Sequence, residues 1–403
     1  MRNLLWTLAI AATVVLIVPH AFAQETLGQS TESAQTQDGD KTMLVKSTKE
    51  RNLEAEVERL QLALDQALQR IAALEAQQVK RVGEEKKAEA AKPAAPTIRF
   101  SGYIQGQYFN ESGEGSKISR FDVRRARFRL DYALAPLASL TLQSEVNDAD
   151  VELRDAYIDL NLSSARRSKL RLGQFKVPLS YQILESSASR LTPERALINT
   201  RSVPGERDRG VVLEFPLQAE NKNSPLLQLG LFDGRGINQI AGNGQTSKNY
   251  LIALHFPNQP LAGRLAFLGG KYTNDALKKV RVNKTRWMMD MQYDRAPWNV
   301  QLQFGGGEGD FPRAGSTVSN TDVRGGYLQV AHQPLGSKFT LLVRYQQYDP
   351  DTDKGGNTIS GPLLGIVYDA TDRVRYMLAL ERLDDEAKSG KTNLVTLRTQ
   401  VRY

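Results

Sequence analysis

The sequence lacks cysteine altogether and contains only three histidines, at positions 20, 255 and 332. Without cysteine there are no disulfides and no thiolate metal sites. The histidines show no metal-ligand spacing, and the glycine run at 305–307 is not followed by the lysine and serine or threonine of a phosphate-binding P-loop. We therefore expect no enzymatic activity, no cofactor and no metal site.

Long apolar runs are also missing, except at the start of the chain. The stretch from Leu4 to Val18 is too short for a comfortable membrane helix, Pro19 ends it, and Ala21-Phe22-Ala23 places small residues where a signal peptidase cleaves. Residues 1–23 are therefore predicted to be a signal peptide, with an uncleaved anchor as the alternative. Beyond them no stretch could cross a membrane as a helix, so membrane insertion would require a β-barrel.

Three segments of different composition follow the predicted signal peptide. Residues 24–48 are polar and predicted to be disordered, and residues 80–96, rich in Lys, Glu, Ala and Pro, are predicted to be a solvated linker. Between them, residues 49–79 carry an apolar heptad repeat typical of an α-helical coiled coil, with a lone surface helix as the alternative. The seam consists of Leu53, Val57, Leu60, Leu64, Ala67, Ile71 and Leu74.

From residue 97 to 403 the apolar period changes to two, which indicates β-strands. Many segments run for about ten residues, the length that a tilted strand needs to cross a bilayer. About sixteen occur, an even number as in bacterial single-chain barrels. They lie near 97–110, 119–135, 138–148, 151–163, 168–180, 208–217, 225–234, 248–257, 263–273, 284–294, 298–306, 323–333, 338–348, 361–369, 373–383 and 393–403.

The connections between these segments are of two kinds. Those after strands two, four, eight, ten and twelve are short and turn-like, whereas those after strands one, five, seven, nine, eleven and thirteen are longer and rich in Gly, Asn and charge. Outer-membrane barrels show this asymmetry between short periplasmic turns and longer outer loops. The sequence therefore predicts an all-β, transmembrane antiparallel barrel preceded by a helical segment.

The predicted barrel is basic, with 41 Lys and Arg against 32 Asp and Glu from residue 97 onward. In the second strand, apolar residues at 126, 128, 130 and 132 predict the lipid face, so Arg125, Arg127 and Arg129 should point into the lumen. An arginine facing lipid at mid-membrane would cost about 2–4 kcal/mol. Rows of lumen cations favour anions. The alternative is a wetted wall in which arginines pair with inward acids, namely Asp131, Asp155, Asp159 and Asp290.

The longest connection, about residues 180–207, follows the fifth strand and is the third outer loop. Structureless connections of this length are usually functional. This one carries several charges of both signs, and if it folded inward it would narrow the pore and meet the strand-two arginines. The charged residues are Glu185, Arg190, Glu194, Arg195, Arg201, Glu206 and Arg207.

Several motifs here resemble the phosphate-selective porin O and P family. The resemblance covers about residues 97–403 and is most specific in 98–215. It rests on Ser101-Gly102-Tyr103-Ile104-Gln105, Arg124-Arg125-Ala126, Gly173-Gln174-Phe175-Lys176-Val177-Pro178-Leu179, Glu185-Ser186-Ser187, Pro193-Glu194-Arg195-Ala196-Leu197 and the run from Val203 to Val211.

The resemblance implies a trimeric sixteen-stranded barrel with the third loop folded in and an arginine ladder for anions. It implies that Arg124 and Arg125 match paired strand-two arginines at the anion site, that Arg195 matches another ligand, that Asp155 matches a nearby acid, and that Arg190 falls where a loop lysine lies. Two positions depart from the family: Tyr103 replaces a first-strand arginine and Arg127 a strand-two tyrosine. Strict alternation turns only one of Arg124 and Arg125 inward unless a bulge intervenes.

The predicted function is passive diffusion of small anions, such as phosphate or other oxyanions, across a bacterial outer membrane. A weakly selective general porin is one alternative. Another is a structural tether that contacts the cell wall through a periplasmic coiled coil. We expect lipid, small inorganic anions and two further copies of the chain as partners, and no nucleic acid.

Overall fold

The computed structural model describes most of the chain from residue 96 onward and a few helical residues before it. The chain divides into two compact units, Met1–Lys87 and Ala88–Tyr403. The described residues are 58–59, 62, 65–66, 69–70, 72–78, 80, 96–113, 116–134, 136–146, 150–163, 167–202, 205–239, 248–274, 280–309, 321–388 and 390–403.

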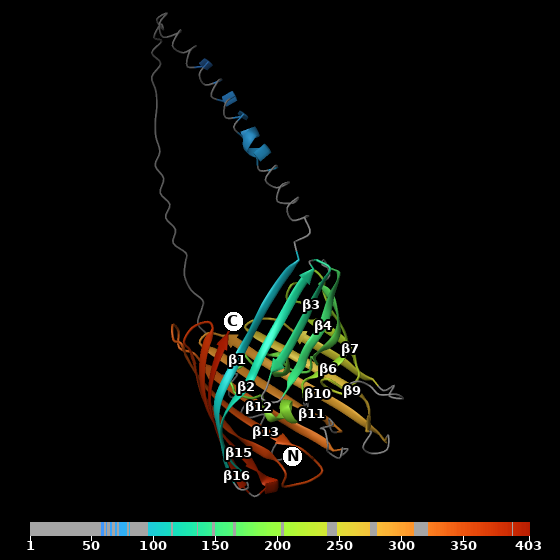
Figure 1. Ribbon diagram of the computed structural model, residues 1–403. Helices are drawn as coiled ribbons and strands as arrows, with labels where there is room; N and C mark the ends of the chain where they lie inside the picture. Colours follow the sequence, from blue (N-terminus) through green and yellow to red (C-terminus); the bar gives the residue numbers. More distant parts are fainter. Residues whose placement is uncertain are drawn as a thin grey trace, which may run out of the picture. The chain divides into compact units, whose positions relative to one another are not determined.

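Sixteen antiparallel strands close into a barrel in the second unit (Figure 1). Each strand pairs with its neighbours in sequence, and β1 pairs with β16, which removes the free edges of the sheet. The strands are β1 (Thr97–Gly113), β2 (Ser116–Leu134), β3 (Ala138–Val146), β4 (Val151–Ser163), β5 (Ser168–Lys176), β6 (Arg207–Pro216), β7 (Leu226–Phe232), β8 (Asn249–Phe256), β9 (Leu261–Asn274), β10 (Val280–Arg295), β11 (Trp298–Glu308), β12 (Asp322–His332), β13 (Phe339–Asp349), β14 (Ile359–Asp369), β15 (Val374–Asp385) and β16 (Gly390–Arg402).

The predicted sixteen-stranded barrel is confirmed, and every predicted segment overlaps one observed strand. Two details were wrong. The fifth segment leaves the wall at Lys176 rather than at residue 180, because Pro178 has no N–H to donate to a ladder. The predicted long connection after the first strand is a hairpin instead, since Gly113 still pairs with Ser116. Strands pair through backbone hydrogen bonds, which need no apolar side chains. The polar residues on either side of this hairpin therefore show no apolar period of two from which the strand ends could be predicted.

Apolar and polar side chains alternate between the two faces of the wall. In β13, Val343 and Tyr345 are about half exposed on the outer face, whereas Arg344 and Gln346 are buried on the inner face. In β2, Phe128 is exposed and its neighbour Arg127 is buried. The outer face is therefore apolar along these strands, and the polar side chains point inward. None of the described helices is both long enough and apolar enough to cross a membrane.

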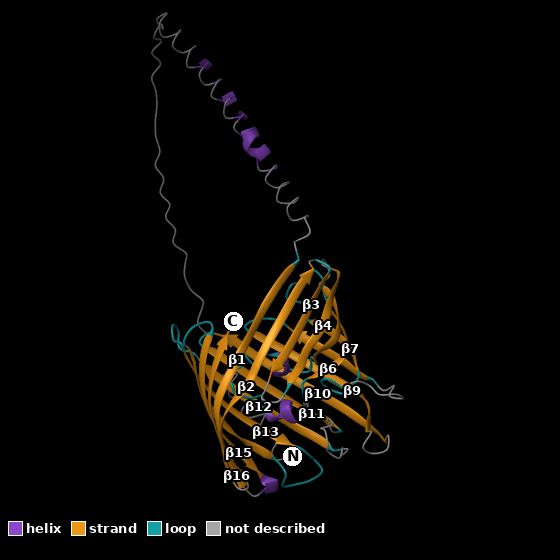
Figure 2. Cartoon of the chain, in the orientation of Figure 1, coloured by secondary structure: helices purple, strands orange, loops and turns teal. Residues whose placement is uncertain are grey.

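Loop three is the connection between β5 and β6, residues 177–206, and its described residues 177–202 and 205–206 lie inside the barrel. It contains α3 (Tyr181–Leu184), whose first turn is capped by the Ser180 hydroxyl accepting from Ile183 N at 3.1 Å, and α4 (Leu197–Ser202). Helix α4 contacts β11, β12 and β13. Figure 2 shows short helices within the ring of strands. This long connection folds into the interior of the barrel because it carries apolar residues that are buried there.

Those apolar residues form the largest core cluster. Ile183 and Ile198 of loop three are fully buried in it. The inward side chains of the barrel in this cluster form the apolar wall, which consists of Leu251, Ala253, Ala266, Leu268, Met288, Val323, Tyr327 and Tyr348 from β8, β9, β10, β12 and β13. Burying each large side chain contributes about 1.5–3 kcal/mol, so this contact anchors loop three.

Before the barrel, all described residues between 58 and 80 are helical. Of the predicted heptad seam only Leu74 is among them, and it is exposed within its unit. The predicted signal peptide (1–23) and polar segment (24–48) lie outside the described residues, as does the predicted linker (80–96) apart from its two end residues. The predicted coiled coil over 49–79 therefore stays a prediction.

Candidate functional site

A β-bulge in β2 turns two consecutive arginines toward the interior. Gln105 of β1 pairs with Arg125, but the next residue, Gly106, pairs with Val123, so Arg124 is an extra residue in the ladder. An extra residue resets the alternation of faces. Arg124 and Arg125 consequently both reach the Glu194 side chain of loop three. A bulge was the condition under which both arginines could face inward, and β2 contains one.

Glu194 is the centre of a cluster of three guanidinium groups. Its Oε1 accepts from Arg124 Nε at 2.9 Å and from Arg398 Nη2 at 3.1 Å, and its Oε2 accepts from Arg124 Nη2 at 3.1 Å and from Arg125 Nη2 at 2.8 Å. Desolvation would raise the pKa of Glu194, but Arg125, Arg124 and Arg398 outweigh it and hold this pKa well below its ordinary value. The carboxylate is therefore ionised at neutral pH.

The next inward arginine, Arg127, meets both the barrel wall and loop three. It forms an ion pair with Glu145 of β3 and donates from Nη1 to the Ser187 hydroxyl at 3.0 Å. Tyr103 is its direct cross-strand partner and shares a 2.5 Å hydrogen bond with the same hydroxyl. The two positions at which the resemblance implied departures from the family therefore lie opposite each other in the β1–β2 pair.

Arg129 lies one step farther along β2 and does not contact loop three. Its Nε and Nη2 each donate to Asp131 at 2.7 Å, with weaker contacts to Thr141 and Tyr157. This pairing of an arginine with a neighbouring acid is the arrangement expected of a water-lined wall in which arginines pair with inward acids. Arg171 pairs with Asp159 at 2.7 Å in the same manner.

Asp155 sits at a second bulge, on β4, where Gln143 pairs with Asp155 and Ser144 with Leu153. The bulge turns Arg154 and Asp155 inward together. Asp155 accepts from Arg207 Nε at 2.9 Å and Nη2 at 3.0 Å, so it holds the end of loop three rather than the strand-two arginines.

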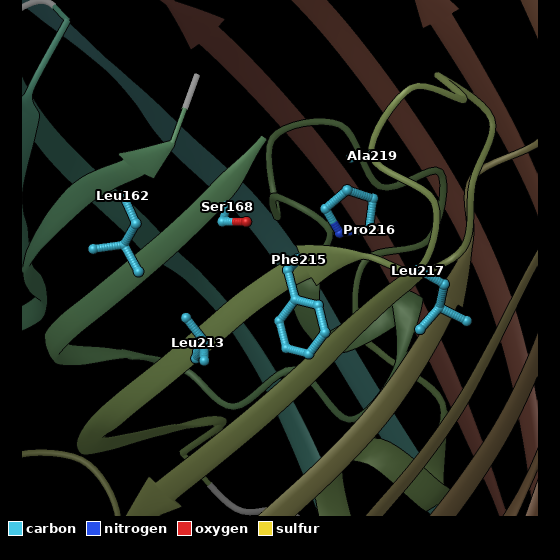
Figure 3. Close-up of a pocket in the computed structure, with 7 residues that line it drawn as sticks. All are labelled: Leu162, Ser168, Leu213, Phe215, Pro216, Leu217 and Ala219. Atoms are coloured by element: carbon cyan, nitrogen blue, oxygen red, sulfur yellow. The ribbon is translucent and has the colours of Figure 1, made fainter. Parts of the chain in front are cut away.

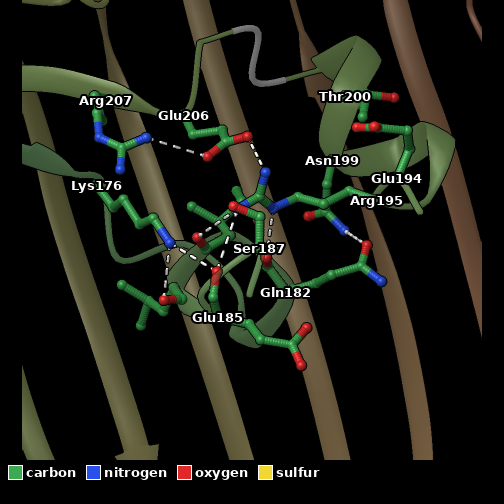
Figure 4. Close-up of polar contacts among 12 residues, drawn as sticks. Lys176, Gln182, Glu185, Ser187, Glu194, Arg195, Asn199, Thr200, Glu206 and Arg207 are labelled. Atoms are coloured by element: carbon green, nitrogen blue, oxygen red, sulfur yellow. Dashed lines mark hydrogen bonds and ion pairs between the residues drawn. The ribbon is translucent and has the colours of Figure 1, made fainter. Parts of the chain in front are cut away.

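The two loop arginines of the predicted site have different surroundings. Arg195 forms an ion pair with Glu206 and donates to the Gln182 carbonyl at 2.6 Å, so it braces the loop from within (Figure 4). Desolvation would raise the pKa of Glu206, but Arg195, Lys176 and Arg207 lower it to about 2. Arg190 is 2% exposed, and none of its guanidinium nitrogens has a hydrogen-bond partner among the described residues.

Exposure separates the inward arginines of β2 into two classes. The side chains of Arg124 and Arg129 are 37% and 33% exposed, whereas those of Arg125 and Arg127 are 5% and 7% exposed beneath loop three. The inner faces of β1, β2 and β16 form the arginine wall, which carries Arg124, Arg125, Arg127, Arg129 and Arg398.

The structure adds residues that the sequence did not single out as ligands. Glu194 was predicted only as one of several charges of the third loop, and Arg398 was not among the predicted site residues; the fold places the two side chains in contact. Gln105 and Gln107 complete the hydrogen bonds of Arg125 and Arg398. Glutamines carry no sequence signal that separates these from the many others in the strands. Predicting these contacts would have required the register between β1 and β16, in which Gln107 pairs with Arg398.

An open pocket of ≈ 550 Å³ lies at the ends of β4, β5 and β6, away from these arginines (Figure 3). It is lined by Leu162, Ser168, Leu213, Phe215, Pro216, Leu217 and Ala219. No lining residue is charged or belongs to the predicted site. Nor do the described residues contain a group of His, Asp and Glu that could hold a metal ion.

The comparisons with known proteins concern the family and the fold. The model of the family described as phosphate-selective porin O and P matches residues 97–284, which supports the family resemblance found in the motifs. The match includes the arginine bulge, loop three and Asp155, whereas Arg398 lies beyond it. No curated protein matches the sequence.

Solved structures with the same fold are distant in sequence. OmpT with loop L8 deleted, an outer membrane protein of Vibrio cholerae, is 12% identical with a TM-score of 0.53, and the match covers 77% of this chain and 100% of that one. OprB of Pseudomonas putida is 12% identical with a TM-score of 0.54, covering 80% and 97%. A Rhodopseudomonas blastica porin mutant is 12% identical with a TM-score of 0.52, covering 76% and 100%. These likenesses concern the fold.

Proposed function

We propose that this chain, whose residues 97–284 match the phosphate-selective porin O and P family, belongs to that family and forms an outer-membrane pore for passive diffusion of small anions. The apolar outer face of a closed barrel suits a lipid bilayer. Family and fold point to a channel rather than to an enzyme.

The observation that carries the anion preference is the β2 bulge. It places Arg124 and Arg125 on the inner face together, on the same wall as Arg398 of β16 and close to Arg127. Four guanidinium groups on one wall of a pore attract anions and repel cations. Each charge-assisted hydrogen bond is worth about 1.5–3 kcal/mol, so two or three suffice to concentrate an oxyanion.

Loop three forms the constriction in this proposal. Its segment from Ser187 to Glu194 bonds to β1, β2 and β16, while Ile183 and Ile198 anchor its other side to the apolar wall. Arg195 and Asp155 contribute by holding the loop in place rather than by binding the anion. Arg129 continues the path below the constriction.

Zero-current potentials across planar bilayers in a KCl gradient test the proposal. We expect the sign that corresponds to chloride preference, and lower conductance in phosphate or sulfate if oxyanions bind at the arginines. A potential near zero would favour the weakly selective general porin, and cation preference would refute the anion pore.

We also expect three copies to assemble. One related fold, OmpT of Vibrio cholerae, is described in a trimer form, and the helical residues 72–78 could add contacts through the predicted coiled coil. Cross-linking of the full chain and of a variant lacking residues 47–80 separates these sources. Weaker envelope integrity with unchanged conductance in that variant would support the tether to the cell wall.

A further inference from the structure

The guanidinium groups of the arginine wall are already hydrogen-bonded to a carboxylate of the protein itself. Both carboxylate oxygens of Glu194 are engaged, by four guanidinium N–H groups from Arg124, Arg125 and Arg398. The Arg124 contact is bidentate, the geometry with which arginine also recognises phosphate. A permeating oxyanion at this level would need the same N–H groups.

Glu194 is nevertheless placed where it could be displaced. Its side chain is 40% exposed, as is that of Arg124 at 37%, whereas Arg125 and Arg398 are 5% and 4% exposed. An anion arriving at Arg124 therefore reaches the outer side of the cluster first. Access to the two covered guanidinium groups requires the carboxylate to give up its bonds to them.

The loop does not depend on this carboxylate for its position. The main-chain carbonyl of Pro193 accepts from Arg398 Nη1 at 2.8 Å, and that of Glu194 accepts from Arg344 Nη1 at 3.0 Å. Farther along, Leu197 N donates to Gln346 at 2.8 Å. The backbone around Glu194 is thus held by other bonds, so its side chain can move between the arginines and the lumen.

We infer that Glu194 is a tethered competitor of the permeating anion: its carboxylate occupies the Arg124–Arg125–Arg398 cluster, and each oxyanion displaces it on binding and is displaced by it on release. This inference rests on the proposed anion pore and deepens it. It gives a physical reason why a dense arginine cluster would not trap its substrate, since a porin must bind weakly enough to release. Because the competitor is intramolecular, its local concentration is high and constant.

The test is the block of chloride current by inorganic phosphate and by sulfate in bilayers containing the full chain. In Glu194→Gln the amide keeps the shape of the side chain but loses its charge. We expect the half-blocking oxyanion concentration to fall about tenfold or more, where tenfold corresponds to about 1.4 kcal/mol. Glu194→Asp keeps the charge but shortens the reach to three guanidinium groups, and should give a smaller fall of about threefold.

Glu220→Gln is the matched control, because this glutamate is exposed in the turn after β6 and undergoes the same change of charge. Its half-blocking concentration should stay within about twofold of the wild type. If Glu194→Gln changes the block no more than Glu220→Gln does, or weakens it, the inference is overturned. If Glu194→Gln fails to fold, an unchanged block in Glu194→Asp overturns it equally. A wild-type pore without anion preference would instead overturn the proposed function.

Discussion

The inner surface of the barrel has two walls of opposite character, and loop three contacts both. Toward the apolar wall it presents Ile183 and Ile198, which are fully buried. Toward the arginine wall it presents Ser187 and Glu194, which form hydrogen bonds and ion pairs. The first contact is non-directional and water-excluding, so it anchors the loop. The second is charged and partly exposed, so it can exchange with solutes.

The largest expected effect comes from weakening the anchored side. Ile198→Ala removes a fully buried side chain, a change that typically costs about 2–5 kcal/mol. The loop should then leave the apolar wall part of the time, and single-channel conductance should rise at least about twofold. Ile366→Ala, on the outer face of β14, is the control and should leave conductance unchanged. The same conductance in both variants would mean that the apolar wall does not anchor the loop.

A smaller effect is expected from exchanging the cross-strand pair at the arginine wall. Arg127→Tyr alone takes one of two arginine partners from buried Glu145 and should cost about 1.5–3 kcal/mol in stability. The double variant Tyr103→Arg/Arg127→Tyr restores a guanidinium to the same pair and should recover most of that loss and of the anion preference. Thermal unfolding in detergent and zero-current potentials measure both. Additive losses in the double variant would show that the two positions are not interchangeable.

The smallest effect is expected from pH. Glu206, with a pKa lowered to about 2 from its ordinary 4.5, stabilises loop three fully above about pH 4.5, and this contribution is lost only as the pH falls through about 2. Glu194, whose pKa is also lowered, behaves in the same direction. These two ion pairs should therefore cause no change of conductance in KCl between pH 8 and about pH 5. A titration near pH 6 that disappears in Glu206→Gln would contradict the Glu206 ion pair.

Much of the barrel could be predicted from the sequence because strand alternation and connection length are local properties. The count of strands and the inward direction of Arg125 and Arg127 followed from them. The inward direction of Arg124 did not, since a bulge depends on how β1 and β2 pair. The choice of Glu194 over Glu185 or Glu206 as the partner of the cluster was likewise beyond the sequence, because it depends on where loop three lies against β16.

The central claim is that the bulged pair of arginines sets the charge preference of the pore. The most direct measurement is the zero-current potential of Arg124→Gln/Arg125→Gln in a KCl gradient, compared with Arg167→Gln/Arg373→Gln, which removes two exposed arginines in turns. We predict that the first variant loses more than about half of the wild-type anion preference and that the second retains it. Equal potentials in both variants would contradict the claim.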